Sequence, residues 1–173
     1  MLSQLPKLRD LRLKSAPATA IPGILTYLLH LRSLDTEYPG AHTTRMRRPS
    51  SNELLSPAAR PVLRSLTVRM SSMDSLDPHD FFQWVQDLVP NPGLETFKLH
   101  VFTLRLEHTI PRKFIINLGR VHGNTLKHFI VGEAQLTLGD IECLCFMFPK
   151  LESLVCTVAG PDIVSCPDAK EIT

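Results

Sequence analysis

Aromatic residues and long hydrophobic runs are both scarce in this sequence, and each shortage narrows the class of protein. Phe, Trp and Tyr make up 6% of the 173 residues, whereas hydrophobic residues as a whole make up 43%, so the core is predicted to be aliphatic. No apolar run approaches the ~20 residues that a helix needs to cross a bilayer. The first residues also lack the charged, apolar and small-residue order of a secretory signal. We therefore expect an intracellular protein, cytoplasmic or nuclear, without a membrane partner.

The net charge is small, and the sequence has only four cysteines. The formal net charge is +2, which by itself does not indicate a nucleic-acid or anionic-membrane partner. Cys143 and Cys145 are two residues apart, so on a helix they point to different sides and cannot bind one metal ion. Because nothing else indicates secretion, we interpret all four cysteines as buried thiols rather than as disulfides. The other two are Cys156 and Cys166.

The sequence does contain an internal repeat. The pattern L-x-x-L-x-L, with another apolar residue allowed in the later positions, occurs at Leu8-Leu11-Leu13, Leu63-Leu66-Val68, Leu94-Phe97-Leu99, Leu126-Phe129-Val131 and Leu151-Leu154-Cys156, with a weaker copy at Leu31-Leu34-Thr36. Successive first leucines are separated by 23, 32, 31, 32 and 25 residues. This regularity predicts six copies of one structural unit.

Each copy has the character of a β-strand, and helical segments separate the copies. Apolar and polar side chains alternate within a copy, and a proline stands two residues before the first leucine in four of the six. Apolar residues recur at helical spacing in residues 21–31, 77–89, 109–123 and 138–148. On these helices we expect Tyr27, Val121 and Cys145 to face the core, and Gly123 to end the third helix. Strands that alternate with helices are predicted to be parallel.

Polar residues occupy one face of every early predicted strand. They are Asp10, Arg12 and Lys14, then Ser33, Asp35 and Glu37, then Ser65, Thr67 and Arg69, then Thr96, Lys98 and His100. A doubly wound sheet has helices on both faces and needs strands that are apolar throughout, so these strands do not fit it. They predict a parallel sheet with one face in water and helices on the other.

In this pattern the six copies resemble leucine-rich repeats, whose consensus continues L-x-x-L-x-L-x-x-N/C. The resemblance extends from Leu5 to about Gly160. It implies an α/β solenoid, a right-handed horseshoe segment with the sheet on its concave face and the helices on its convex face. The position for Asn or Cys is instead filled by Ala16, Pro39, Ser71, Phe102, Ala134 and Ala159, so irregular turns are expected. Long repeats that enter through P-x-L-x-x-L are similar to the repeat region of F-box leucine-rich repeat proteins, although the F-box itself is absent.

The repeats are predicted to form one solenoid over residues 1–160, with an insertion at 38–61 and a tail at 161–173. The insertion carries Arg45, Arg47 and Arg48 before two serines, which would suit a basic docking element or a phosphorylation site. A solvated loop between two repeats explains the same residues, and we prefer it. Because Met1 lies only seven residues before the first repeat leucine, the chain either belongs to a longer protein or has its first repeat covered by a partner.

Motifs for catalysis or cofactor binding are absent from the sequence. It has no Gly-rich phosphate loop, no G-x-S-x-G nucleophile and no H-E-x-x-H, and the seven histidines show no ligand spacing. Asp10, Asp35 and Glu37 could pair across neighbouring strands, but general acid–base catalysis needs a desolvated pocket, which an open sheet face lacks. We therefore predict a protein that is not an enzyme and that binds no cofactor, metal or small-molecule substrate.

The polar sheet face is the candidate site, and another protein is the predicted partner. We expect that partner to contact Arg12, Lys14, Asp35, Glu37, Arg69, Lys98 and His100. The resemblance to F-box leucine-rich repeat proteins implies substrate recognition for a ubiquitin ligase. Two rival functions remain open: an α/β enzyme of unknown reaction, and a nucleic-acid binder that uses the basic loop at 45–48.

Toward the C-terminus the same face is predicted to become apolar. Ile130, Gly132, Val155 and Thr157 take the positions that charged residues hold in the earlier copies. Either a partner docks there with an apolar anchor and a charged rim, or the tail covers these residues. We prefer the tail, because exposed pairs of valine and isoleucine would otherwise favour aggregation.

Overall fold

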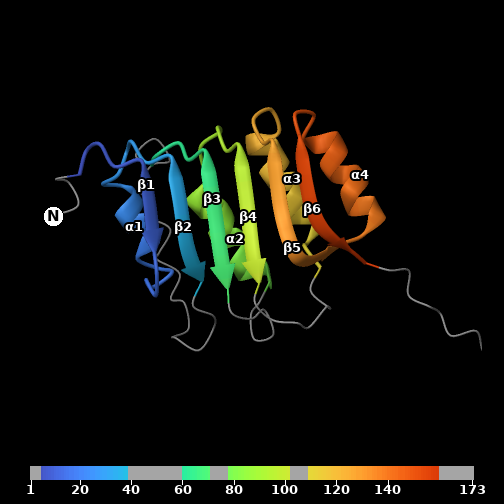
Figure 1. Cartoon of the computed structure of the whole chain (residues 1–173), viewed down its shortest axis with the longest axis horizontal. Helices are drawn as coiled ribbons and strands as arrows, with labels where there is room; N and C mark the ends of the chain where they lie inside the picture. The colour runs from blue at the N-terminus through green and yellow to red at the C-terminus, as the bar shows by residue number, and fades with distance from the viewer. Residues whose placement is uncertain (1–4, 39–59, 71–77, 102–108, 160–173) are drawn as a thin grey trace, which may run out of the picture.

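Six parallel strands lie side by side in chain order and form one sheet. The computed structural model describes residues 5–38, 60–70, 78–101 and 109–159. Their elements are β1 (Asp10–Leu13), α1 (Ile21–Leu25), β2 (Ser33–Tyr38), β3 (Ser65–Met70), α2 (Pro78–Leu88), β4 (Thr96–Val101), α3 (Arg112–His122), β5 (His128–Leu136), α4 (Leu138–Met147) and β6 (Ser153–Val158). The strand order is β1-β2-β3-β4-β5-β6, and every neighbouring pair is parallel (Figure 1). The predicted α/β class with parallel strands is confirmed.

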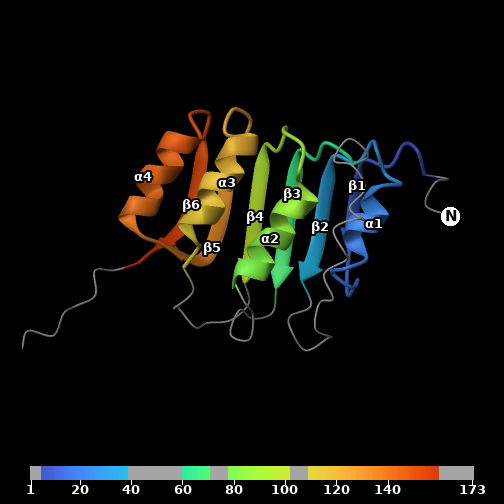
Figure 2. The ribbon, with the colours of Figure 1, turned by 180° about the vertical axis from the view of Figure 1, so that it is seen from behind.

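The helices of the described ranges all lie on one face of the sheet. Figure 1 shows the strands in front of α2 and α3, with α4 beyond β6 at the end of the sheet, and Figure 2 shows the helices from the other side. Burial alternates along β2, β3 and β4, so that Leu34, Thr36 and Tyr38 of β2 point into the core. The polar residues between them lie on the opposite face, which we call the front face. Alternation in the sequence therefore correctly predicted which face the helices cover.

A ladder of backbone hydrogen bonds links the turns that precede the strands. The carbonyl of Arg9 accepts the N–H groups of Arg32 and Ser33 at 2.7 and 2.9 Å. The same pattern recurs at the following turns, where the acceptors are the carbonyls of Arg32, Arg64, Glu95 and Lys127. Each acceptor residue directly follows the first leucine of a repeat copy. Equivalent backbone groups are thus satisfied at each step, and the repeat in the sequence is also a repeat in the structure.

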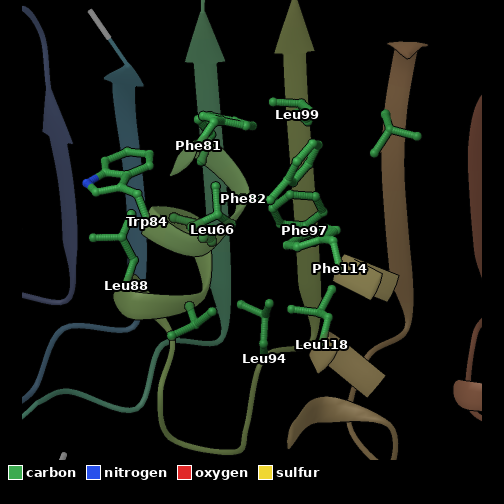
Figure 3. Packing of buried hydrophobic residues seen from close by; sticks show 14 of the residues in the cluster. Leu66, Phe81, Phe82, Trp84, Leu88, Leu94, Phe97, Leu99, Phe114 and Leu118 are labelled. Atoms are coloured by element: carbon green, nitrogen blue, oxygen red, sulfur yellow. The ribbon is translucent and has the colours of Figure 1, made fainter. Parts of the chain in front are cut away.

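The core lies between the sheet and the helices, and its centre is aromatic. Leucine, isoleucine and valine make up most of the buried residues, but the largest fully buried side chains are Phe81, Phe97, Phe114, Phe129 and Phe148. The ring centroids of Phe82 and Phe114 are 4.6 Å apart, and Figure 3 shows both beside Phe97. The prediction of an aliphatic core is therefore only partly right. The few aromatic residues are concentrated at its centre, where each ring buries a large apolar area.

The helices differ from the prediction mainly at α1. This helix begins at the predicted residue but covers only Ile21–Leu25 of the predicted 21–31. Its N-cap Ala20 makes no side-chain hydrogen bond, and Gly23 is a weak helix former, so little local structure stabilises it. Tyr27, Val121 and Cys145 are exposed, so their predicted burial is wrong. In contrast, α3 does end at His122 with Gly123 as its cap.

None of the helices in the described residues is long and apolar enough to cross a membrane. The predicted tail at 161–173 lies outside the described residues, as does the predicted insertion apart from Tyr38, Arg60 and Pro61. The basic loop at 45–48 is part of that insertion and is likewise not described.

Candidate functional site

Front-face side chains form rows that run across the strands. One row places Arg12, Asp35, Thr67, Lys98, Ile130 and Val155 on consecutive strands, and the next places Glu37, Arg69 and His100 beside one another. Because neighbouring strands lie about 4.8 Å apart, side chains within a row are close enough to interact. The structure therefore brings six of the seven predicted site residues onto one continuous surface, and Lys14 lies just beyond the end of β1.

Asp35 is the centre of the charged part of this surface. Its carboxylate accepts hydrogen bonds from Arg69 Nε at 2.8 Å and from Arg69 Nη2 at 3.0 Å. Arg12 Nε lies 3.4 Å from the same carboxylate. The hydrogen bonds from Arg69, together with the charges of Arg69, Arg12 and His100, hold the pKa of Asp35 below its ordinary value of 3.8, although partial burial raises it. The arginine fork thus fixes this carboxylate in place.

The seven predicted contact residues are not equally available to a partner. Arg12 and Arg69 both pair with Asp35, and Glu37 accepts a hydrogen bond from the backbone N–H of Ser15 at 3.1 Å. Lys14 is exposed and directly follows the end of β1. Lys98 and His100, both on β4, make no hydrogen bond or ion pair with the residues that the structure describes. The hydrogen-bonding groups of both side chains are therefore open to an incoming ligand, although His100 also interacts electrostatically with Asp35.

The front face becomes apolar next to these two residues, as predicted. Ile130 lies beside Lys98 in the row, and Val155 lies beside Ile130 with 47% of its surface exposed. A side chain on Gly132 would meet no atom of the described residues within 4 Å, so the surface is open there. The hydroxyl of Thr157 donates to the carbonyl of Gly132 at 2.6 Å, where the register between β5 and β6 shifts. The tail that is predicted to cover this surface lies outside the described residues.

Groups that could support other chemistry are dispersed. No cluster of three or more His, Cys, Asp or Glu side chains that could hold a metal occurs among the described residues. The three described cysteines are free thiols, and Cys145 is exposed while Cys143 and Cys156 are partly buried. Their predicted burial is therefore wrong for Cys145 and only partly right for Cys143 and Cys156, because α4 and β6 lie at the end of the described sheet, where no further described strand covers them. Cys166 lies outside the described residues.

Two groups in distinctive surroundings were not predicted from the sequence. His122 is 1% exposed, although a histidine next to an apolar helical position gives no signal of burial.

Arg9, Arg32 and Arg64 precede β1, β2 and β3 and belong to a surface outside the front face. Their equivalent positions in three successive repeat copies were the available signal.

Comparison with known proteins gives no match, either to a protein-family model, to a curated protein or to a solved structure.

Proposed function

We propose that this chain is a leucine-rich repeat solenoid that binds a partner protein on its front face and has no catalytic role. The observation that carries the proposal is a parallel sheet whose described helices all lie behind it, which leaves a row of polar and then apolar side chains open on the front. The ladder of equivalent backbone hydrogen bonds before each strand supports a solenoid built from stacked repeats.

The contact is centred on β4 to β6 rather than on the paired charges of β1 to β3. Lys98 and His100 supply polar groups that make no hydrogen bond or ion pair with the described residues, and Val155 supplies an exposed apolar side chain in the same row as Lys98. An apolar anchor beside a polar rim is the usual composition of a protein interface. The partner would therefore present an apolar side chain next to an acidic one.

The repeat resemblance suggests a context for this contact. Substrate recognition for an F-box type ubiquitin ligase would use such a surface, with the F-box supplied elsewhere. Because no F-box stands in this sequence, direct binding to the ligase adaptor subunit is not part of the proposal.

A charge reversal on the front face tests this function. Lys98→Glu should weaken capture of partner proteins by about tenfold or more, because it places a like charge against the partner's acidic group. Lys113→Glu is the matched control, since Lys113 is exposed on α3, behind the sheet. Proteins captured from native cytosol would be quantified by mass spectrometry for the parent and both variants. Equal capture by the parent and Lys98→Glu, with unchanged thermal unfolding, would reject the front face.

A further inference from the structure

A groove of about 900 Å³ lies at the edge of the sheet where β1, β2 and β3 begin, the upper edge in Figure 1. We call it the arginine groove. Its lining residues are Pro6, Lys7, Arg9, Leu29, His30, Leu31, Arg32, Arg60, Val62 and Arg64. Five of them are lysine or arginine, and none is acidic. The groove shares no residue with the front face, so a ligand bound here would be additional to the proposed front-face partner and independent of it.

Cations in the arginine groove are poorly neutralised by the described part of the protein. Arg64 forms an ion pair with Glu95 at 3.3 Å, with both side chains substantially exposed. Arg9 and Arg32 are exposed and make no side-chain hydrogen bond or ion pair with the described residues. Their backbone carbonyls belong to the ladder before the strands, which holds them at equivalent positions on neighbouring turns. Because neighbouring strands lie about 4.8 Å apart, these arginine side chains start close together and concentrate positive charge at this edge of the sheet.

Arg60 is the unusual member of the set, because it is buried without a carboxylate partner among the described residues. Its side chain is 9% exposed, and Nη1 donates to the carbonyl of Asp87. Its Nε is buried and has no hydrogen-bond partner in the same part of the chain. A buried guanidinium that lacks a counter-charge carries a large desolvation penalty, which a nearby anion would offset. Arg60 therefore adds a second, independent indication that the groove is built for negative charge.

The aliphatic residues of the groove indicate what kind of anion binds. Leu29 is 57% exposed and Val62 is 50% exposed, and both line the groove between the basic side chains. None of its described lining residues is Phe, Tyr or Trp, and the imidazole of the exposed His30 is a small platform for stacking the bases of a single-stranded nucleic acid. A sugar–phosphate backbone would also leave the two aliphatic side chains uncovered. A peptide with alternating acidic and aliphatic residues matches both features.

We propose that the arginine groove binds an acidic peptide segment of a partner protein. Carboxylates of the peptide pair with Arg9, Arg32 and Arg64, and its aliphatic side chains cover Leu29 and Val62. In an extended peptide, side chains on one face recur about every 6.6 Å, a spacing that long arginine side chains can follow.

A binding experiment with a synthetic peptide tests the inference. The probe is a fluorescein-labelled peptide of repeated Glu-Leu-Asp-Leu, and binding is followed by fluorescence anisotropy at low and at physiological salt. The full chain should bind this peptide and should not bind the same peptide with Gln and Asn in place of Glu and Asp. Arg9→Glu with Arg32→Glu should weaken binding by about tenfold or more. Leu29→Ser should weaken it severalfold.

The matched control is Lys113→Glu with Arg120→Glu, which makes the same change of net charge at two exposed positions of α3. This variant should bind as the parent does, and circular dichroism should show that all variants are folded. Absence of binding by the parent, or equal weakening by both double variants, would overturn the proposal. It would also be overturned if an oligo-dT of similar charge bound as tightly and Leu29→Ser had no effect, since the groove would then be a general polyanion site.

Discussion

Arg69 illustrates what sequence reasoning can and cannot determine for a single side chain. Alternation in the sequence correctly placed it on the front face, near Asp35 and Glu37. In the register of the sheet Arg69 lies directly beside Glu37, yet its guanidinium reaches diagonally to Asp35. The choice between two carboxylates depends on side-chain geometry and on the Ser15 N–H that Glu37 accepts. Neither is encoded in the spacing of the residues, so the pairing could not be predicted.

His122 is the buried titratable residue that the sequence did not reveal. Its Nδ1 accepts the N–H of Leu94 at 3.4 Å, and its Nε2 lies 3.0 Å from the carbonyl of Val89, to which it donates as a neutral imidazole. The ring therefore ties the C-terminal turn of α3 to the segment between α2 and β4. Burial lowers the pKa of His122 below its ordinary value of 6.5, although the hydrogen bond to Val89 raises it.

This lowered pKa predicts a specific dependence of stability on pH. Below about pH 6.5 the unfolded chain binds a proton at His122 that the native protein does not, so the free energy of unfolding should fall as pH decreases toward the native pKa. Above pH 6.5 the contribution of the neutral ring is complete. His122→Gln should cost about 1–3 kcal/mol at neutral pH, because it disturbs two buried hydrogen bonds. Urea unfolding on both sides of pH 6.5 measures this, and parallel pH curves for the parent and His122→Gln would contradict it.

At the scale of elements, α3 and α4 approach each other through glycine. A Cβ on Gly119 would lie 2.6 Å from Met147 Cε and 2.8 Å from Met147 Cβ. A Cβ on Gly123 would lie 2.6 Å from the Met147 carbonyl oxygen. These two glycines therefore allow the last two helices to pack closely. In the sequence, Gly123 could be recognised only as the end of a helix. The two glycines together were too few to indicate a phosphate loop.

A pair of glycine substitutions separates this contact from helix propensity. Alanine is favoured over glycine in a helix by about 1 kcal/mol. At Gly23 of α1 no atom of the described residues lies within 4 Å of a new Cβ, so Gly23→Ala should stabilise the protein by up to about 1 kcal/mol. Gly119→Ala should instead destabilise it by about 1–3 kcal/mol, because the Met147 Cβ cannot move without its helix. Chemical denaturation measures both, and a Gly119→Ala variant as stable as the parent would refute close packing of α3 against α4.

Over the whole molecule, stability should decrease from the middle of the sheet to its two ends. β3 and β4 are flanked by strands on both sides and bury alternate residues completely. Within the described residues β1 and β6 each pair with one neighbour, and neither contains a fully buried residue. Hydrogen bonds at the ends are therefore broken at lower cost than those at the centre.

Hydrogen exchange followed by mass spectrometry tests this gradient. Peptides from β3 and β4 should remain protected longest, and those from β1 and β6 should exchange first. Peptides from α2 should follow β3 and β4, because Phe81, Phe82 and Trp84 pack in the same core. Uniform protection across all six strands would mean that the sheet opens only as a unit.

The fold was more predictable than the site because the repeat imposes the same local requirements six times. Even the weak copy, Leu31-Leu34-Thr36, forms a strand, and Thr36 is fully buried at the position of the third leucine. Its hydroxyl has no hydrogen-bond partner among the described residues. Burial depends on which residues alternate, and alternation is visible in sequence. The arginine groove depends on turns from three copies and on the buried Arg60, and only the folded chain brings these together.

The strictly sequential order of the strands also has a mechanical consequence. Within the described sheet, each strand is bonded only to the copies before and after it along the chain. Tension applied to the two ends would therefore detach the outermost copy first and transfer the load inward one copy at a time. Such a protein would lengthen in increments under force, while the copies not yet detached keep their shape.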